Sequence, residues 1–281
     1  SYSTLMKKRT IAEKDRDSEA PPLESTPMAQ RKGAFRFPAG SKAGDFFHNV
    51  LENIDFREPD HSDAIDEQLN HHGLTRADPK LAAKIIQATL QADLPDGRGN
   101  SFQLSQLCPS DRLNELGFHF TIDEICFKEL GKRLLSEGVS GFFVEYLSQV
   151  PETIAIGREE FIKGFIDLTF RLDGRFFILD WKSNILGGRQ ENFRQDRLIE
   201  PMRTSGYLMQ YHLYLVALHR HLRNSLPDYD YDLHVGGAHY LFIRGMLDPE
   251  QGGDGIFFDR PDKVLVERLD QALASSGGSP S

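Results

Sequence analysis

The stretch GFIDLTFRL-DG-RFFILDWKS, residues 164–183, decides the fold of this chain. Two runs rich in apolar and aromatic residues, 164–172 and 175–181, are separated only by Asp173 and Gly174. Asp-Gly between such runs is a strong hairpin signal, because a type I′ turn needs positive φ at both central residues. The sequence therefore predicts two antiparallel strands joined by a two-residue turn.

The turn also sets the register of this predicted hairpin. If the loop is two residues long, Leu168 faces Leu179 and Asp167 faces Asp180, with Cβ atoms ~4.5–5.5 Å apart. Side chains alternate between the faces of a strand, so Lys182 lies on the same face as Asp180. The opposite face is predicted to form a core from Ile166, Leu168, Phe170, Phe177, Leu179 and Trp181. The two acids and the lysine should therefore converge.

Two carboxylates that face each other across a sheet repel, and Asp is disfavoured inside strands. A hard divalent cation would offset this charge, and Mg²⁺ favours one or two carboxylates together with water and phosphate oxygens. The alternative is a register shifted by one residue, in which both aspartates face water. That alternative does not explain Lys182 in so apolar a strand. The pattern favours a metal site.

Composition excludes several classes of protein. The 281 residues include 33 Lys and Arg against 42 Asp and Glu, a formal net charge of −9. This charge argues against a simple non-specific DNA-coating protein, because such binding depends on Lys and Arg neutralising phosphates. No apolar run approaches the ~20 residues of a membrane span, and no signal peptide is recognised. Two cysteines, Cys108 and Cys126, are too few for a disulfide framework or a four-thiolate site, so we expect a reducing compartment.

Turn and helix signals divide the rest of the chain. Residues 1–32 have the composition of a linker or poorly ordered arm, and 275–281 that of a disordered tail. Between them, 33–110 is predicted to be mainly helical and 111–274 to contain the core. The expected elements are helices near 41–54, 78–92, 123–136 and 205–223, and strands near 115–122 and 239–245. Helices around a small sheet that contains a hairpin indicate an α/β or α+β layered domain.

The hairpin and its flanks resemble a known family. The Asp at the end of GFIDL, followed by a hairpin and the Asp-x-Lys of LDWKS (179–183), is similar to the signature of PD-(D/E)XK nucleases. Three flanking segments resemble RecB-type nuclease domains: GSKAGDFFHNVLENIDF (40–56), with its Gly-x-x-x-His helix, QYHLYLVALHRHL (210–222) and PDYDYDLHVGGAHYLFIRG (227–245). The resemblance runs from about Gly40 to Arg260. It implies a restriction-endonuclease-like α/β core, a small mixed sheet with a central hairpin flanked by helices, plus an N-terminal helical region.

The resemblance implies roles for individual residues. By position, the implied metal ligands are His48, Asp167, Asp180 and the main-chain carbonyl of Trp181. The implied catalytic set is Asp167, Asp180 and Lys182. Gln210 and Tyr214 match a Gln-x-x-x-Tyr feature that faces the site and substrate, and Glu115 matches an acid that is less regularly assigned. Taken alone, His48 would be read as a surface or capping residue, and Gln210 and Tyr214 as ordinary residues of a helix surface.

The implied activity is Mg²⁺-dependent hydrolysis of DNA, of the exodeoxyribonuclease V β-subunit type, in double-strand break repair and recombination. The strand would come from a RecB-type ATP-dependent helicase region, and the partners would be RecC- and RecD-like subunits in a bacterial cytoplasm. The stretch 186–204 carries Arg189, Arg194, Arg197 and Arg203. It is predicted to be a basic loop that guides the strand, or else a solvated charge run.

Two other functions are compatible with parts of the pattern. The first is a non-catalytic module that keeps a nuclease fold for protein docking or DNA threading, which loss of an acid or of the lysine would favour. Asp167, Asp180 and Lys182 are all present. The second is a metal-dependent hydrolase of small phosphates, for which no pocket motif is recognised. No Gly-x-x-x-x-Gly-Lys-Ser/Thr motif occurs, so an ATPase site is not expected in this chain.

Overall fold

The computed structural model of the chain describes residues 32–122, 125–151, 155–156, 160–249 and 252–274. The predicted tail, 275–281, lies outside these residues, as does the predicted arm apart from Lys32. Among the described residues, no helix is long and apolar enough to cross a membrane.

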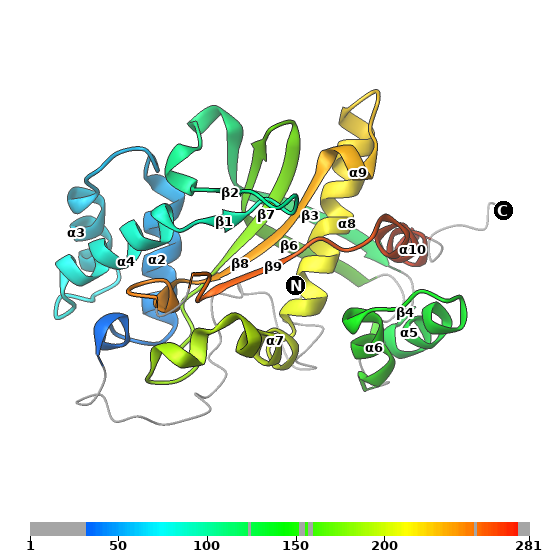
Figure 1. Ribbon diagram of the computed structural model, residues 1–281, viewed down its shortest axis with the longest axis horizontal. Coiled ribbons are helices and arrows are strands. Elements are labelled where there is room, and N and C mark those ends of the chain that lie inside the picture. The colour runs from blue at the N-terminus through cyan, green and yellow to red at the C-terminus, as the bar shows by residue number, and fades with distance from the viewer. Residues whose placement is uncertain (1–31, 123–124, 152–154, 157–159, 250–251, 275–281) are drawn as a thin grey trace.

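A five-stranded mixed sheet forms the centre of the described chain (Figure 1). Its strands lie in the order β3-β6-β7-β8-β9, and every neighbouring pair is antiparallel except β7 and β8, which are parallel. The bounds are β3 (Arg112–Ile122), β6 (Glu160–Leu172), β7 (Arg175–Lys182), β8 (Val235–Phe242) and β9 (Ile256–Asp259). The predicted α/β class with a central hairpin is confirmed.

The turn between β6 and β7 is the one that the sequence predicts. Asp173 has φ 49° and Gly174 has φ 78°, so both central residues are in the left-handed region that a type I′ turn requires. The ladder pairs Leu172 with Arg175 and Leu168 with Leu179. The predicted register is confirmed over this length, and a shift by one residue is excluded there.

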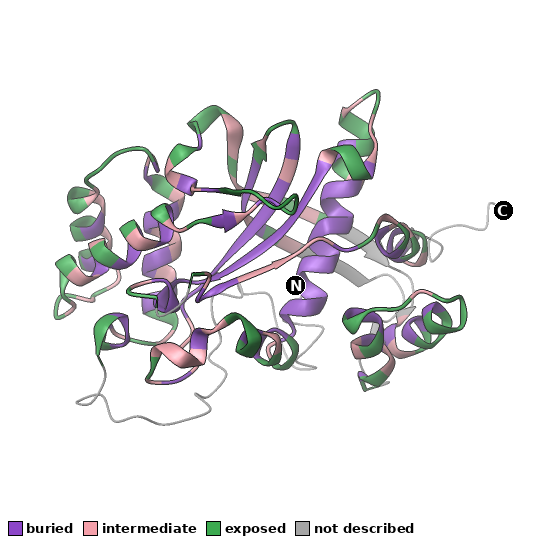
Figure 2. Cartoon of the chain, viewed as in Figure 1, coloured by how far each residue is buried: buried purple, intermediate pink, exposed green. Residues whose placement is uncertain are grey.

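Helices cover one face of the sheet and bury a first core against it (Figure 1). The longest is α8 (Tyr207–Ser225), which is buried along most of its length in the core against the sheet (Figure 2). The others on this side are α5 (Phe127–Ser136), α6 (Phe142–Gln149), α7 (Gln195–Thr204) and α10 (Lys263–Ala274). This layer positions α8 directly over β7 and β8.

A second core lies on the other face, beneath the N-terminal helices. This layer contains α2 (Ser41–Asn53), α3 (Ser62–His71), α4 (Pro79–Gln91) and the strand pair β1 (Leu94–Pro95) and β2 (Ser101–Phe102). At the start of α4, Asp78 accepts a hydrogen bond from the Lys80 amide and Pro79 occupies the first turn, which is favourable helix-start chemistry. The sheet is therefore covered by helices on both faces.

Short elements complete the described chain. They are η2 (Gly33–Arg36), η3 (Leu104–Gln106), η4 (Pro109–Asp111), β4 (Ile125–Cys126), β5 (Ala155–Ile156), η5 (Gln190–Phe193), α9 (Tyr231–His234) and η6 (Ile243–Gly245). The strand predicted at 239–245 in fact covers 235–242, and its last residues turn into η6. The helix predicted at 123–136 begins only at Phe127, after β4.

A buried histidine makes the stability of the fold depend on pH. His239 of β8 is fully buried among Phe102, Phe170 and Phe177, and its Nε2 lies 2.9 Å from the Pro95 carbonyl oxygen. Burial lowers the pKa of His239 to about 4, because the charged imidazolium is poorly solvated there.

We expect His239 to destabilise the fold as the pH falls from 6.5 to 4. In this window the unfolded chain binds a proton that the folded chain does not, which costs on the order of 3 kcal/mol. His239→Gln stays neutral and should lose less stability over the same range, as measured by urea unfolding at several pH values. The matched control is His221→Gln at an exposed histidine. A His239→Gln profile parallel to that of the wild type would contradict the prediction.

Candidate active site

The site lies where β6 and β7 separate. The ladder between them ends at Leu168 and Leu179, and beyond it the main-chain N–H of Trp181 donates to Asp167 Oδ2 at 3.0 Å. Asp167 and Asp180 are therefore close to each other, but the predicted direct cross-strand pairing of the two is wrong. The Asp167 side chain takes a position between the strands and satisfies a main-chain donor there.

The alternation of side chains between the two faces of β6 is also interrupted at Asp167. Leu168 and Phe170 belong to one core, as predicted, and this core lies beneath α2, whereas Ile166 belongs to the core beneath α8. The prediction that Ile166 shares a face with Leu168 is therefore wrong. Neighbouring β3 has an irregularity at the same step, because Glu115 lies between the pairs Asn114–Leu168 and Leu116–Ile166 and has φ 51°. Glu115 is thus inside β3, at the level of Asp167.

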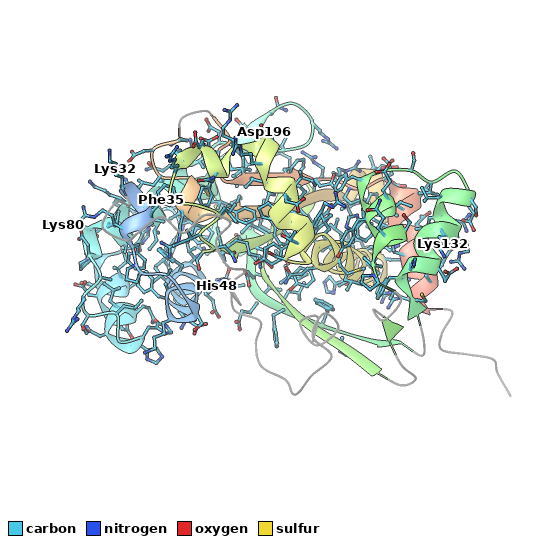
Figure 3. All side chains as sticks on the ribbon, turned by 90° about the horizontal axis from the view of Figure 1, so that it is seen from below. Lys32, Phe35, His48, Lys80, Lys132 and Asp196 are labelled. Carbon is cyan, nitrogen blue, oxygen red and sulfur yellow. The ribbon has the colours of Figure 1, made fainter. Side chains whose placement is uncertain are left out.

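Helix α2 carries His48 to this point (Figure 3). Its apolar residues Phe46, Phe47, Val50 and Leu51 are buried in the core. His48 Nδ1 lies 3.3 Å from Asp167 Oδ2, and both side chains remain partly exposed. Burial raises the pKa of Asp167, but the nearby His48 and Lys182 and the Trp181 N–H outweigh burial and hold the pKa below its usual value. Asp167 is therefore the carboxylate of the site that stays ionised.

Asp180 and Lys182 are more deeply buried, with 2% and 4% of their surface exposed. Lys182 Nζ lies 2.6 Å from Asp180 Oδ1. Burial, followed by the charge of Asp167, raises the pKa of Asp180 to about 7 in spite of the lysine. The pKa values of the two aspartates are thus shifted in opposite directions, because Asp167 has more neighbouring groups that favour its charged form. The site carries more negative charge than Lys182 alone offsets.

Two tyrosines that the sequence reasoning did not identify surround the lysine. Lys182 Nζ lies 4.1 Å from the ring centroid of Tyr207 and 5.4 Å from that of Tyr240. Such cation–π contacts stabilise a desolvated ammonium. Tyr207 lies on α8, one turn before Gln210, and that spacing is the only signal in the sequence that could have pointed to it. Tyr240 is paired with Asp180 across the parallel ladder of β7 and β8.

Gln210 and Tyr214 form a buried hydrogen-bonded chain with Tyr240. The Tyr240 hydroxyl donates to Gln210 Oε1, and Gln210 Nε2 donates to the Tyr214 hydroxyl oxygen, each at 2.9 Å. Burial, followed by the charges of Asp180 and Asp167, raises the pKa of Tyr214 well above its usual value. Tyr214 therefore lies within electrostatic range of both acids. The alternative that Gln210 and Tyr214 are helix-surface residues is excluded, because both are buried.

The donors of the site are suited to a hard divalent cation. An imidazole, two carboxylates and a main-chain carbonyl are ligands of this kind, and the two neighbouring acids repel each other without such an ion. As they stand, however, no three His, Cys, Asp or Glu side chains within the described ranges converge closely enough to bind a metal ion. Asp180 is turned toward Lys182, and Asp167 toward His48 and Trp181. The residues therefore fit a metal ion by their chemistry.

The predicted basic loop at 186–204 is largely helical. Its residues form η5 and α7. Two of its arginines contact acids close by in sequence, since Arg189 lies 3.3 Å from Glu191 and Arg194 lies 3.6 Å from Asp196. The positive charge of this stretch is therefore partly neutralised locally.

Comparison with known proteins agrees with this geometry. A family model for the PD-(D/E)XK nuclease superfamily matches residues 29–276. The chain belongs to the PD-(D/E)XK nuclease superfamily. Members of this superfamily generally use divalent metal ions. The resemblance seen in the hairpin signature is therefore confirmed.

The chain is also similar to RecBCD enzyme subunit RecB from several bacteria. It is 34% identical to the Escherichia coli (strain K12) protein over 85% of this chain and 20% of that protein. The values are 31%, 83% and 18% for Haemophilus influenzae, and 30%, 84% and 24% for Mycobacterium tuberculosis (strain H37Rv). The chain thus spans about a fifth of the length of these relatives.

Proposed function

We propose that this chain is a Mg²⁺-dependent deoxyribonuclease domain of the RecB type, hydrolysing phosphodiester bonds as in exodeoxyribonuclease V. The observation that carries the proposal is the grouping of Asp167 with the buried Asp180 and Lys182, with His48 in contact with Asp167. Two acids that repel each other beside a lysine, largely shielded from water, lower the stability of the fold. Phosphodiester hydrolysis is a chemistry that uses all three groups.

In this proposal His48, Asp167, Asp180 and the Trp181 carbonyl hold the ion. When bound, Mg²⁺ supplies Lewis-acid polarisation of the phosphate and lowers the pKa of a bound water. Lys182 orients the attacking water or offsets charge on the phosphate, and its ammonium acts as a compact point charge for this purpose. Tyr207 and Tyr240 hold that ammonium in place. Gln210 and Tyr214 support the site from α8.

The charge of the chain and the names of its relatives support a proposal for how DNA reaches the site. A chain with a net charge of −9 should bind DNA weakly by itself. The relatives are named as subunits of the RecBCD enzyme. We therefore propose that a RecB-type ATP-dependent helicase region delivers single strands to the site, that RecC- and RecD-like subunits are partners, and that the chain acts in the bacterial cytoplasm in repair of double-strand breaks.

The chain itself, incubated with single-stranded DNA, tests the proposal. We expect cleavage with Mg²⁺ and none with excess EDTA, and product strands with a 5′-phosphate and a 3′-hydroxyl. End labelling with and without phosphatase treatment reads the ends. Intact DNA at high protein concentration with Mg²⁺ would overturn the proposal and favour the non-catalytic docking or threading module.

A further inference from the structure

The ribbon formed by β3 and β6 has an unusual pair of adjacent cross-strand partners. Gly117 faces Phe165, and Phe118 faces Gly164. A Cβ atom added at Gly117 would lie 3.3 Å from the ring of Phe165, and one at Gly164 would overlap the ring of Phe118. Each phenylalanine ring therefore lies over the glycine of the neighbouring strand. Since successive residues point to opposite faces, the two rings cover opposite faces of the ribbon.

The two rings have different surroundings. Phe118 packs edge-on against Tyr214, with the ring centroids 5.2 Å apart, and so continues the core beneath α8. Phe165 is on the other face and is 49% exposed. Core packing accounts for the position of Phe118. Phe165, in contrast, contacts the glycine of the neighbouring strand and keeps about half of its surface in water.

Phe165 lies close to the candidate active site. It precedes Asp167 by two residues, which is ~6.6 Å along a strand, and Asp167 contacts His48. Figure 3 shows β3 and β6 running out from the body of the molecule near the labelled His48. A phosphate bound at the acids would thus bring a neighbouring base within reach of the ring.

Building on the proposed nuclease function, we propose that Phe165 is a base-stacking position for single-stranded DNA entering the site. Aromatic rings bind unpaired bases of any sequence through their faces, whereas bases in a duplex are already stacked on each other. A protein partner is less well matched, because docking surfaces are contiguous apolar patches. Among the described side chains, the other exposed residues of this ribbon are Leu113, Gly117, His119 and Arg171, and only Leu113 is a large apolar residue, so they do not form such a patch around the ring. The ring therefore selects unpaired strands without reading their sequence.

Binding of a fluorescent oligothymidylate to the 281-residue chain tests this, measured by anisotropy in EDTA so that no cutting occurs. We expect Phe165→Ala to weaken binding by roughly 5- to 150-fold, and Phe165→Trp to retain it. In cleavage with Mg²⁺, Phe165→Ala should raise KM and leave kcat nearly unchanged. The matched control is Leu113→Ala, a similarly exposed apolar residue (54%) on the neighbouring strand, which should behave as the wild type.

An abasic strand of the same length separates stacking from a structural role. The wild type should bind it as weakly as Phe165→Ala binds the normal strand, and the substitution should cause no further loss. Equal losses on both strands, or unchanged binding of oligothymidylate by Phe165→Ala, would overturn the inference. Binding is measured without cleavage, so the two proposals are tested separately. If the wild type cuts DNA but the binding data show either of these results, only the stacking position is refuted. If the wild type does not cut DNA, the nuclease proposal is refuted.

Discussion

Replacing Asp180 with asparagine is expected to reduce Mg²⁺-dependent cleavage of single-stranded DNA by about 10³-fold or more. The amide keeps the shape of the side chain but removes the charge that the proposed metal ligand supplies. An ion that polarises a phosphoryl oxygen is worth several kcal/mol of transition-state stabilisation, and each 1.36 kcal/mol corresponds to about tenfold in rate. The loss should appear in kcat, measured with saturating DNA and Mg²⁺.

The same substitution is expected to leave the metal-free protein at least as stable as the wild type above pH 7. Burial and the charge of Asp167 raise the pKa of Asp180 to about 7. A carboxyl with a raised pKa contributes its stability at low pH and loses that contribution as the pH rises through 7. The asparagine has no such dependence, and Asp167 remains to balance Lys182.

Thermal unfolding at pH 8, with EDTA and with Mg²⁺, separates these two effects. The Tm of the wild type should rise with Mg²⁺, because a ligand bound only by the folded state stabilises it, and the Tm of Asp180→Asn should not. Asp173→Asn is the matched control. It makes the same chemical change in the same hairpin, at an exposed turn position where asparagine is favoured. If Asp180→Asn cleaves DNA as the wild type does, Asp180 is not a metal ligand.

Local signals account for the parts of the fold that the sequence predicts well. Asp173 and Gly174 specify a turn whose dihedral angles only a few residue types adopt, and the turn fixes the ladder from Leu172 to Leu168. Side chains alternate along β7, so that register also places Asp180 and Lys182 of the Asp-x-Lys on one face. The long apolar stretch of α8 is read from helical spacing, with an error of two residues at each end. Each of these inferences needs only neighbours within a few residues.

Long-range packing determines the parts that could not be predicted. The interruption at Asp167 occurs together with the positive φ of Glu115, on a strand more than 50 residues earlier in sequence. Lys182 contacts Tyr240 because β8 pairs in parallel with β7, after a crossover through α8 that carries Tyr207. No pattern within the hairpin contains this information, so the environment of the lysine is known only from the structure.

Replacing Arg244 with methionine is expected to destabilise the protein by about 3–5 kcal/mol. Arg244 follows β8 and is fully buried. Its guanidinium donates to the carbonyl oxygens of Ser183 at 2.6 Å, Phe37 at 3.0 Å, Ala34 at 3.2 Å and also Pro38. Methionine fills much of the volume but leaves these buried carbonyls without their donors, and each unsatisfied group costs about 1–3 kcal/mol, partly offset by relaxation.

The four carbonyls join two parts of the candidate site. Ser183 directly follows Lys182 on β7, and the segment from Ala34 to Pro38 leads into α2, which carries His48. Arg244→Lys should recover only part of the stability, because a single ammonium cannot reproduce the planar fork of donors. Urea unfolding measures both variants, with Arg76→Met at an exposed arginine as control. A loss below about 1 kcal/mol for Arg244→Met would show that the segments hold together without it. The expected larger loss would mean that one buried cation holds two segments together: the segment that leads into α2, which carries His48, and the end of β7, which carries Lys182.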